Sequence, residues 1–287
     1  MSILEFADPR KPLHDSLELR GPGGPAAVRE LARTLGLTAG SRVLELGCGC
    51  GRTACQLARE FGCQVVATDL DPDCLEAALA RVVRERLKGQ VVVRQADMRA
   101  LFAYFPLQRF EAVIAENSVV HLGIEVVAPS VLAVVEEEGY FAFTLPTWKR
   151  PPEEIPEPIR SFWEQSARAP MRTLEQNLAA LAAQGFGRGF AYELDRQAWE
   201  LYYAELRVRL AELEAAGIRT PEIEHARREL ELWDRHDAFR AVGAFVYVGQ
   251  PGERASKGLG ALAAELARPG YAGVPGSAPA ASLLVPS

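Results

Sequence analysis

The nonapeptide Val-Leu-Glu-Leu-Gly-Cys-Gly-Cys-Gly at residues 43–51 limits the possible folds more than any other stretch of the chain. An apolar run that carries one acid, Glu45, leads directly into three alternating glycines, and a helix-like stretch follows at 52–61. This pattern predicts a buried strand, a tight turn, and a helix whose unpaired N–H groups point back at the turn. Glycines belong where a ligand lies against bare backbone or where the turn excludes a Cβ. A nucleotide-like ligand is therefore the first hypothesis.

The spacing of the glycines separates the nucleotide classes. A dinucleotide fingerprint requires a third glycine three residues after Gly49, where this chain has Arg52. No Gly-Lys-Ser/Thr follows, which excludes a phosphate-binding P-loop. The acid Glu45 suits a ligand with a cationic end better than a pyrophosphate. The motif resembles the first motif of the class I S-adenosylmethionine-dependent methyltransferases. That resemblance implies cofactor contacts from Glu45, Gly47, Cys48, Gly49 and Gly51.

A second predicted strand, 64–68, ends in Asp69, whose carboxylate can accept both hydroxyls of a ribose. The segment resembles the second motif of the same family, which implies Asp69 as the ribose acid and Leu70 beside the adenine. Asp71 and Pro72 are typical of a helix start. A capping pair without a ligand also explains the two acids, and NAD proteins use an acid at similar spacing. Asp69 therefore supports nucleoside binding without choosing the cofactor.

The next two strand ends favour S-adenosylmethionine. A strand that starts at Val91 ends at Asp97, and the resemblance implies that Asp97 accepts the adenine amino group while the backbone of Met98 serves the ring. The strand 110–116 and the following segment 117–122 resemble the fourth motif, which closes over the methionine part of the cofactor and faces the substrate. Four strand-end motifs in the family's order make a chance agreement improbable.

The remaining pattern predicts an α/β fold, a Rossmann-like seven-stranded and mostly parallel sheet with helices on both faces. Further strands are expected at 138–145, 187–194 and 241–248, with a helix at 173–184. The last strand is expected to run in the reverse direction, as the resemblance implies. NAD-binding Rossmann domains lack such a strand, which again favours the methyltransferase.

Composition limits the classes of substrate and the cellular compartments that fit this chain. The net charge of −6 argues against nucleic-acid substrates, which call for a basic face. No apolar stretch is uninterrupted enough to span a membrane, and the N-terminus carries no charged-then-apolar signal, so a cytoplasmic protein is expected. The five cysteines all lie between residues 48 and 74, but Cys-x-Cys without a second pair is a poor zinc signature. No metal is therefore expected.

Residues 1–250 are predicted to form the methyltransferase domain, with three segments outside the bare fold that determine the substrate. An N-terminal cover (1–35) carries a Pro-Gly-rich turn at 21–25, for which a plain surface turn is an equal alternative. The second cover (147–171) is rich in proline, so it is expected to be irregular rather than helical. Its aromatic residues are candidates for a pocket wall, with plain packing as the alternative. These are Trp148, Phe162 and Trp163.

The third segment is a helical insert at 195–236, before the last strand. Apolar side chains recur at helical spacing over 199–213 and again over 223–233, which predicts two helices. This hairpin fits either a lid over the substrate or the surface of a homodimer. Residues 251–287 are rich in Gly, Ala, Pro and Ser and are predicted to form a flexible tail.

The predicted function is methyl transfer to a small-molecule acceptor, which mainly requires in-line placement and exclusion of water. His121 is the candidate base, with a packing role as the alternative, and Glu116 is placed to orient the cofactor or a substrate amine. A non-catalytic S-adenosylmethionine-binding module and a nicotinamide-dependent oxidoreductase are the rivals. The sequence leaves open whether the acceptor atom is oxygen, nitrogen, carbon or sulfur.

Overall fold

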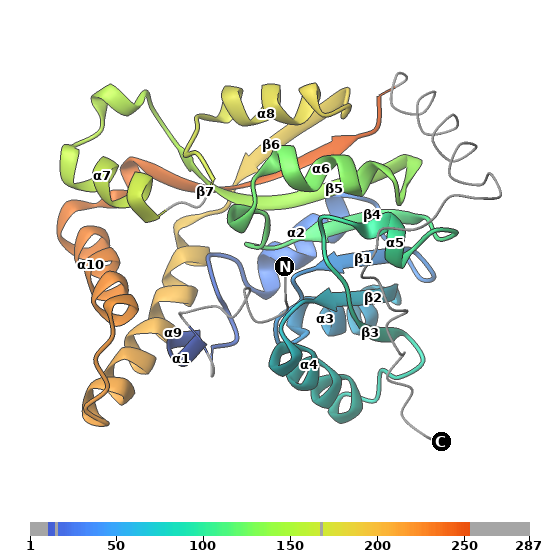
Figure 1. The fold of residues 1–287 in the computed structure, drawn as a ribbon, viewed down its shortest axis with the longest axis horizontal. Coiled ribbons are helices and arrows are strands. Elements are labelled where there is room, and N and C mark those ends of the chain that lie inside the picture. The colour runs from blue at the N-terminus through green and yellow to red at the C-terminus, as the bar shows by residue number, and fades with distance from the viewer. Residues whose placement is uncertain (1–10, 15–16, 167–168, 253–287) are drawn as a thin grey trace.

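The computed structural model describes residues 11–14, 17–166 and 169–252, in which seven strands form one sheet of order β3-β2-β1-β4-β5-β7-β6 (Figure 1). The strands are β1 (Arg42–Leu46), β2 (Gln64–Asp69), β3 (Val91–Gln95), β4 (Phe110–Ala115), β5 (Val135–Trp148), β6 (Arg188–Glu193) and β7 (Val242–Gln250). Strands β1 to β5 pair in parallel, whereas β7 runs antiparallel to both β5 and β6. The predicted sheet and its reversed last strand are confirmed.

The register of the central strands determines where the motifs meet. Val43 pairs with Val65 of β2 on one side and with Ala112 of β4 on the other. The loops that leave the carboxyl ends of these three parallel strands therefore share one edge of the sheet. Ligands of open α/β sheets bind at this edge.

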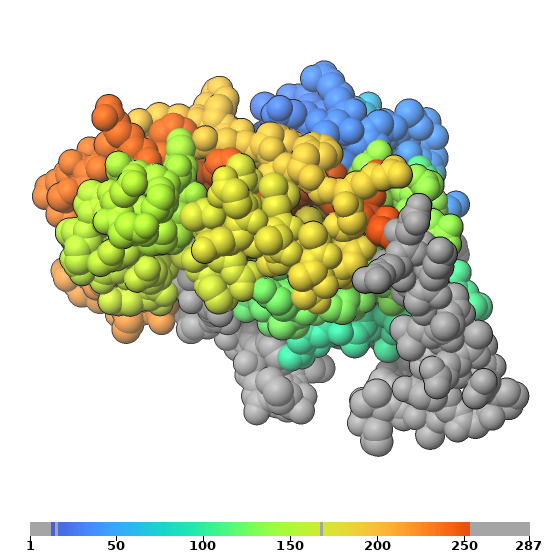
Figure 2. Space-filling model, turned by 90° about the horizontal axis from the view of Figure 1, so that it is seen from above, coloured from blue at the N-terminus to red at the C-terminus, as the bar shows by residue number. Residues whose placement is uncertain are grey.

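Helices cover both faces of the sheet and separate the core into two layers. Adjacent strand residues such as Val43 and Leu44 point to opposite faces and belong to different apolar clusters. One layer includes α2 (Pro25–Thr34), α3 (Arg52–Phe61) and α4 (Pro72–Arg84). The other includes α5 (Leu101–Tyr104), α6 (Ile124–Leu132) and α8 (Leu174–Ala183), and Figure 2 looks down on α8.

The predicted helical insert consists of α9 (Arg196–Ala215) and α10 (Pro221–His236), which flank one end of the sheet (Figure 1). The side chain of Asp195 caps α9 by accepting from the Ala198 N–H, and Thr220 caps α10 by accepting from the Ile223 N–H. The apolar stripes of both helices are buried. The two predicted helices are therefore present, and their aromatic residues pack on one another within the apolar layer that also includes α2 and α3.

The prediction that the proline-rich cover at 147–171 is irregular rather than helical is wrong for residues 157–166. Strand β5 is longer than expected and ends at Trp148, and α7 (Glu157–Ser166) follows a short 3-10 turn, η3 (Pro152–Glu154). This helix tolerates Pro158 because the residue lies in its first turn, where a backbone N–H has no helical partner. Trp148 is also not a pocket wall, since it is buried and pairs with Val242 of β7.

Parts of the predicted segments fall outside the described residues. These are residues 1–10 and 15–16 of the N-terminal cover, residues 167–168, and the predicted tail from residue 253 onward. The remainder of the N-terminal cover includes α1 (Lys11–His14) and the turn before α2. Within the described ranges, no helix combines the length and the apolar character that crossing a membrane would require.

Candidate functional site

A cavity of about 410 Å³ lies at the carboxyl ends of β1, β2 and β4, within the usual size range of small-molecule pockets. We call the part lined by the loops after β1 to β4 the cofactor end, and the part lined by α7, α9 and α10 the acceptor end. Most of the sequence-predicted site residues line this cavity, and two do not, namely Gly51 and Asp97. Those that line it are Glu45, Gly47, Cys48, Gly49, Asp69, Leu70, Met98, Glu116 and His121.

The glycine loop after β1 forms the floor of the cofactor end. Gly47 has φ +71°, and a Cβ placed on it would lie 2.6 Å from the Cβ of Ser118, in the loop after β4. Gly49 has φ +53°, and a Cβ there would meet nothing within 4 Å because the position faces open space. The first glycine thus permits close packing of two loops, and the second leaves bare backbone toward a ligand.

Asp69 joins the loops that follow β1 and β2. Its Oδ2 accepts from the Gly49 N–H at 2.9 Å, and its Oδ1 accepts from the N–H groups of Leu70 and Asp71 at 2.8 and 3.0 Å. A carboxylate offers about four lone-pair sites, so these three bonds position the group and leave acceptor capacity toward the cavity. This geometry is compatible with the predicted binding of ribose hydroxyls.

Three charged side chains, Glu45, Arg52 and Glu116, meet between β1, the start of α3 and the end of β4. Glu116 Oε2 accepts from the Thr53 hydroxyl and lies 3.3 Å from Arg52 Nη2. Among the described residues, Glu45 Oε2 and the Nε and Nη1 atoms of Arg52 are buried without hydrogen-bond partners. Burial, followed by the charge of Glu116, raises the pKa of Glu45 to about 8, although the Arg52 charge opposes the shift. Sequence reasoning missed Arg52 as a site residue because it treated this position only as a departure from the dinucleotide motif.

Asp97 lies beside the cavity rather than in its wall. Its carboxylate accepts from Arg99 Nε and Nη2 and from the Arg99 backbone N–H, at 2.5–3.0 Å. Burial alone would raise the pKa of Asp97, but these bonds and the Arg99 charge lower it. Its neighbour Met98 does line the cavity. The predicted contact of Asp97 with adenine remains a prediction.

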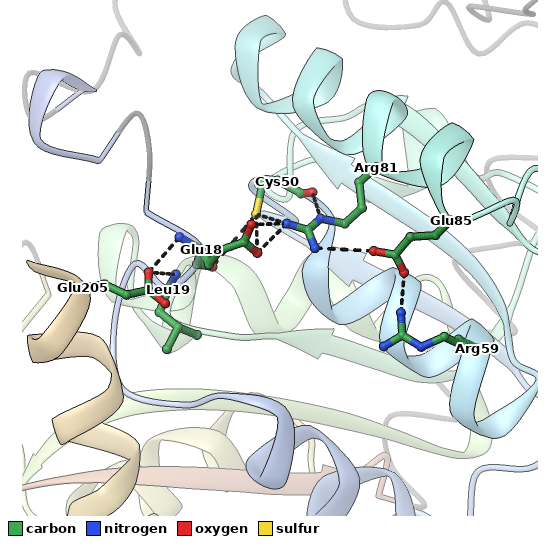
Figure 3. A network of polar contacts seen from close by, with 7 residues as sticks. All are labelled: Glu18, Leu19, Cys50, Arg59, Arg81, Glu85 and Glu205. Atoms are coloured by element: carbon green, nitrogen blue, oxygen red, sulfur yellow. Dashed lines mark hydrogen bonds and ion pairs between the residues drawn. The ribbon is translucent and has the colours of Figure 1, made fainter. Parts of the chain in front are cut away.

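A segment that we call the strap, residues 17–23, passes over the cofactor end and ties it to the insert. The N–H groups of Glu18 and Leu19 donate to Glu205 Oε2 of α9 at 2.8 and 3.1 Å (Figure 3). The Glu18 carboxylate pairs with Arg81 of α4, whose Nε donates to the Cys50 carbonyl of the glycine loop. Figure 3 follows these ion pairs onward from Arg81 through Glu85 to Arg59.

The strap also contacts the loop after β4. Asn117 Nδ2 donates to the Pro22 carbonyl at 3.1 Å, and a Cβ on Gly21 would lie 2.6 Å from the Asn117 side chain. The predicted turn at 21–25 is therefore packed against the site and is not a plain surface turn. The strap covers the cofactor end because both the sheet loops and α9 hold it.

The acceptor end is made of aromatic and acidic side chains. Helix α10 presents Glu222, His225 and Glu229 at i, i+3 and i+7, which is one helical face. The residues from the other helices are Phe162, Trp163 and Ser166 of α7 and Trp199 and Tyr202 of α9. The sequence analysis named the two α7 aromatics but missed the polar face of α10. The spacing of three and then four residues between Glu222, His225 and Glu229, beside the apolar stripe of the same helix, is the sequence signal for this polar face.

His121 lies in the 3-10 turn η2 (Val119–His121) and lines the cavity, as a base would require. The cysteines lack the properties of metal ligands or of an activated nucleophile. Burial raises the pKa of Cys55 and Cys74 to about 12 and that of Cys63 to about 11, so these thiols stay protonated near neutral pH. Among the described residues, no group of three or more His, Cys, Asp or Glu side chains is arranged to hold a metal ion.

Comparisons with known proteins agree with this geometry. Residues 43–139 match the family described as methyltransferase domain. Trans-aconitate 2-methyltransferase of Paracidovorax citrulli is 30% identical over 58% of this chain and 60% of its own length. Methyltransferase GfsG of Streptomyces halstedii is 31% identical over 37% of this chain and 38% of its own length. The matches thus cover less than two thirds of these curated relatives.

A solved structure shares the fold across most of the chain. It is a methyltransferase from Thiobacillus denitrificans in complex with S-adenosyl-L-homocysteine, with a TM-score of 0.68. The likeness covers 86% of this chain and 100% of that one at 20% identity. The sheet order and this likeness define a Rossmann-like fold. Residues 43–139 thus match a methyltransferase domain, and the fold is that of a solved S-adenosylmethionine-dependent methyltransferase, which supports the prediction from the motifs.

Proposed function

We propose that this chain transfers the methyl group of S-adenosylmethionine to a small-molecule acceptor bound at the other end of the same cavity. One observation carries the proposal. A single cavity extends from the cofactor end, which the sequence motifs line, to the end enclosed by α7, α9 and α10. Such covering helices exclude water and limit the size of the acceptor. The relative that is named for trans-aconitate, a small molecule, supports the same class of acceptor.

The residues at the cofactor end fit an S-adenosylmethionine molecule. The partnerless Oε2 of Glu45 and the partnerless N–H groups of Arg52 complement an ammonium and a carboxylate, the two ends of a methionine moiety. Asp69 would accept from the ribose hydroxyls, and Leu70 and Met98 would flank the adenine. When bound, the cofactor supplies a methyl group already activated on a sulfonium.

The residues of the chain then need only position the two reactants, exclude water and, for some acceptors, remove a proton. The strap covers the cofactor, the covering helices hold the acceptor, and both exclude water, while Glu116 orients Arg52 through their ion pair. His121 lines the cavity just past β4 and would take a proton from an acceptor that must lose one. Such an arrangement relies on placement more than on acid–base chemistry.

Calorimetric titration with S-adenosylhomocysteine, and with NADH for comparison, tests the proposal. We expect micromolar binding of the former alone. Asp69→Ala should abolish this binding, whereas His121→Ala should preserve it and lower turnover. Tight binding of NADH would favour the oxidoreductase instead. Unchanged affinity in the Asp69 variant would show that the ribose assignment is wrong.

A further inference from the structure

Trp199, near the start of α9, carries a buried donor without a partner. The residue is 2% exposed and lines the cavity, and its Nε1 has no hydrogen-bond partner among the described residues. A buried N–H that reaches no acceptor has lost the hydrogen bond that it made with water in the unfolded chain, so such groups are rare in native proteins. In the wall of a cavity, this N–H indicates that a bound molecule provides the acceptor.

The neighbouring tryptophan shows that the same helix packing can satisfy such a donor. Trp233 of α10 stacks on Trp199 with ring centroids 5.0 Å apart, and its Nε1 donates to Glu200 Oε1 at 2.9 Å. Trp233 is not among the described residues that line the cavity. Of the two stacked indoles, the one within the helix packing therefore has an acceptor from the chain, whereas the one in the cavity wall has none from the described residues.

The chain itself holds the Trp199 indole in place. The Asp195 side chain accepts from the Ala198 N–H in the first turn of α9, and the Ala198 carbonyl accepts from the Gly23 N–H of the strap. The indole ring is held by its stacking on Trp233. A donor that is already ordered loses little conformational entropy when it binds a ligand. Trp199 is thus suited to orient a ligand where the strap meets the covering helices.

The kind of acceptor follows from which buried groups lack a partner. Among the described residues that line the cavity, only Glu45, Arg52 and Trp199 have buried side-chain atoms without a hydrogen bond, and the first two lie at the cofactor end. In the described part of the acceptor end, one buried donor is therefore unmatched and no buried acceptor is. A carbonyl oxygen only accepts, whereas a hydroxyl or an amine brings protons that need acceptors of their own. A carbonyl group matches this end best.

We infer that the methyl acceptor carries a carbonyl oxygen on an apolar body, and that the Trp199 indole N–H donates to this oxygen. The inference rests on the proposed function, because that function assigns this end of the cavity to the acceptor. Phe162 and Trp163 of α7 line the same end and pack on the apolar body. The carbonyl belongs to a ketone, an ester, an amide or a carboxylate. Trp199 thus determines which acceptors bind and how they face the cofactor.

Three probes of nearly equal shape test the group that Trp199 binds: acetophenone, 1-phenylethanol and ethylbenzene. They share a phenyl ring with a two-carbon substituent and differ in carrying a carbonyl, a hydroxyl or no oxygen. Each is titrated into protein that is saturated with S-adenosylhomocysteine and labelled with nitrogen-15 at its indole groups. Nuclear magnetic resonance follows the indole N–H signals. We expect acetophenone to shift the Trp199 signal and to bind about ten-fold more tightly than ethylbenzene, as one hydrogen bond to a buried unmatched donor allows.

Trp199→Phe removes the donor and keeps an aromatic ring. In this variant, acetophenone should lose its ten-fold advantage over ethylbenzene. The ratio of the two affinities within one variant cancels the effect of the substitution on packing. Trp233→Phe is the matched control, because it changes the other ring of the same stack and removes an N–H that Glu200 already binds. It should keep the ten-fold ratio.

Equal binding of acetophenone and ethylbenzene by the wild type, an unshifted Trp199 signal, or a ratio that persists in Trp199→Phe would overturn the inference. Equal binding of acetophenone and 1-phenylethanol would show that the site does not select a carbonyl group. Benzoate distinguishes the two sources of the carbonyl, because tighter binding than acetophenone indicates a carboxylate and weaker binding a neutral group.

The inference and the proposed function fail in different ways. If protein that binds S-adenosylhomocysteine binds none of these probes, the assignment of Trp199 is wrong and the proposed function stands. Failure to bind S-adenosylhomocysteine at all would overturn the proposed function, and the acceptor assignment with it.

Discussion

The two ends of the cavity differ in what holds their residues in place. At the cofactor end, backbone groups and short side chains occupy the ends of hydrogen-bonded strands, and Asp69 is held by three backbone N–H groups. At the acceptor end, long side chains project from helices that pack on one another through Phe162, Trp199 and Trp233. Strand ends are fixed by the register of the sheet, whereas helix faces move with the packing between helices. We therefore expect substitutions at the first end to act through backbone geometry and those at the second through contacts.

The largest expected effect is at Gly47, where backbone geometry leaves no room for a side chain. Gly47→Ala places a Cβ 2.6 Å from Ser118 on a residue with φ +71°, so both strain and a clash oppose folding. We expect the free energy of unfolding to fall by about 3 kcal/mol, measured by urea denaturation.

Gly217 provides the matched control, because it has the same φ of +71° and a Cβ there meets nothing within 4 Å. Gly217→Ala carries the backbone strain without the clash and should cost about 1 kcal/mol. Equal losses in the two variants would mean that close packing of the β1 and β4 loops does not constrain the cofactor end.

The same contrast explains how much could be predicted from sequence. Glycine spacing and strand-end acids are local signals, so most residues that line the cofactor end could be named from the sequence, although Gly51 and Asp97 do not line it. The reversed last strand was expected only from the resemblance to a family. The acceptor end depends on which helix faces meet, and no local pattern states that α7 and α10 turn toward one cavity. Proline density misled the prediction for α7, because proline in a first turn does not prevent a helix. Arg52 was missed because its role depends on Glu116, sixty-four residues later.

A second, smaller effect tests the electrostatics of the cofactor end. Glu45 has a folded-state pKa of about 8, against an ordinary value near 4.5, so between these pH values the folded protein binds more protons than the unfolded chain. Stability from this group is therefore lost as pH rises through that window, by about 2 kcal/mol between pH 6 and pH 8. Denaturation curves of the wild type and Glu45→Gln should diverge accordingly, with the variant less sensitive to pH.

Bound S-adenosylhomocysteine should reduce this pH sensitivity in the wild type. Its ammonium would lie near Glu45, favour the ionised carboxylate and lower the pKa of that group. A wild-type slope that matches the slope of the variant, with or without this ligand, would show that Glu45 is ionised in the free protein. The positive charge of Arg52 would then be sufficient to keep Glu45 ionised.

The smallest effect concerns Glu205 of α9, whose carboxylate accepts from the strap through the Glu18 and Leu19 N–H groups. Glu205→Gln keeps the shape of the side chain but removes the charge from both hydrogen bonds. Charge-assisted bonds exceed neutral ones by about 1 kcal/mol, so the strap should open more often and S-adenosylhomocysteine should dissociate about five-fold faster. Stopped-flow dissociation measures this rate, with Glu212→Gln on the same helix as control, since Glu212 pairs only with Arg209 among the described residues.

If the insert instead holds only the acceptor, the dissociation rate will stay at the wild-type value. The two ends would then be mechanically independent, and the strap would be held by Arg81 and Asn117 from the sheet side alone.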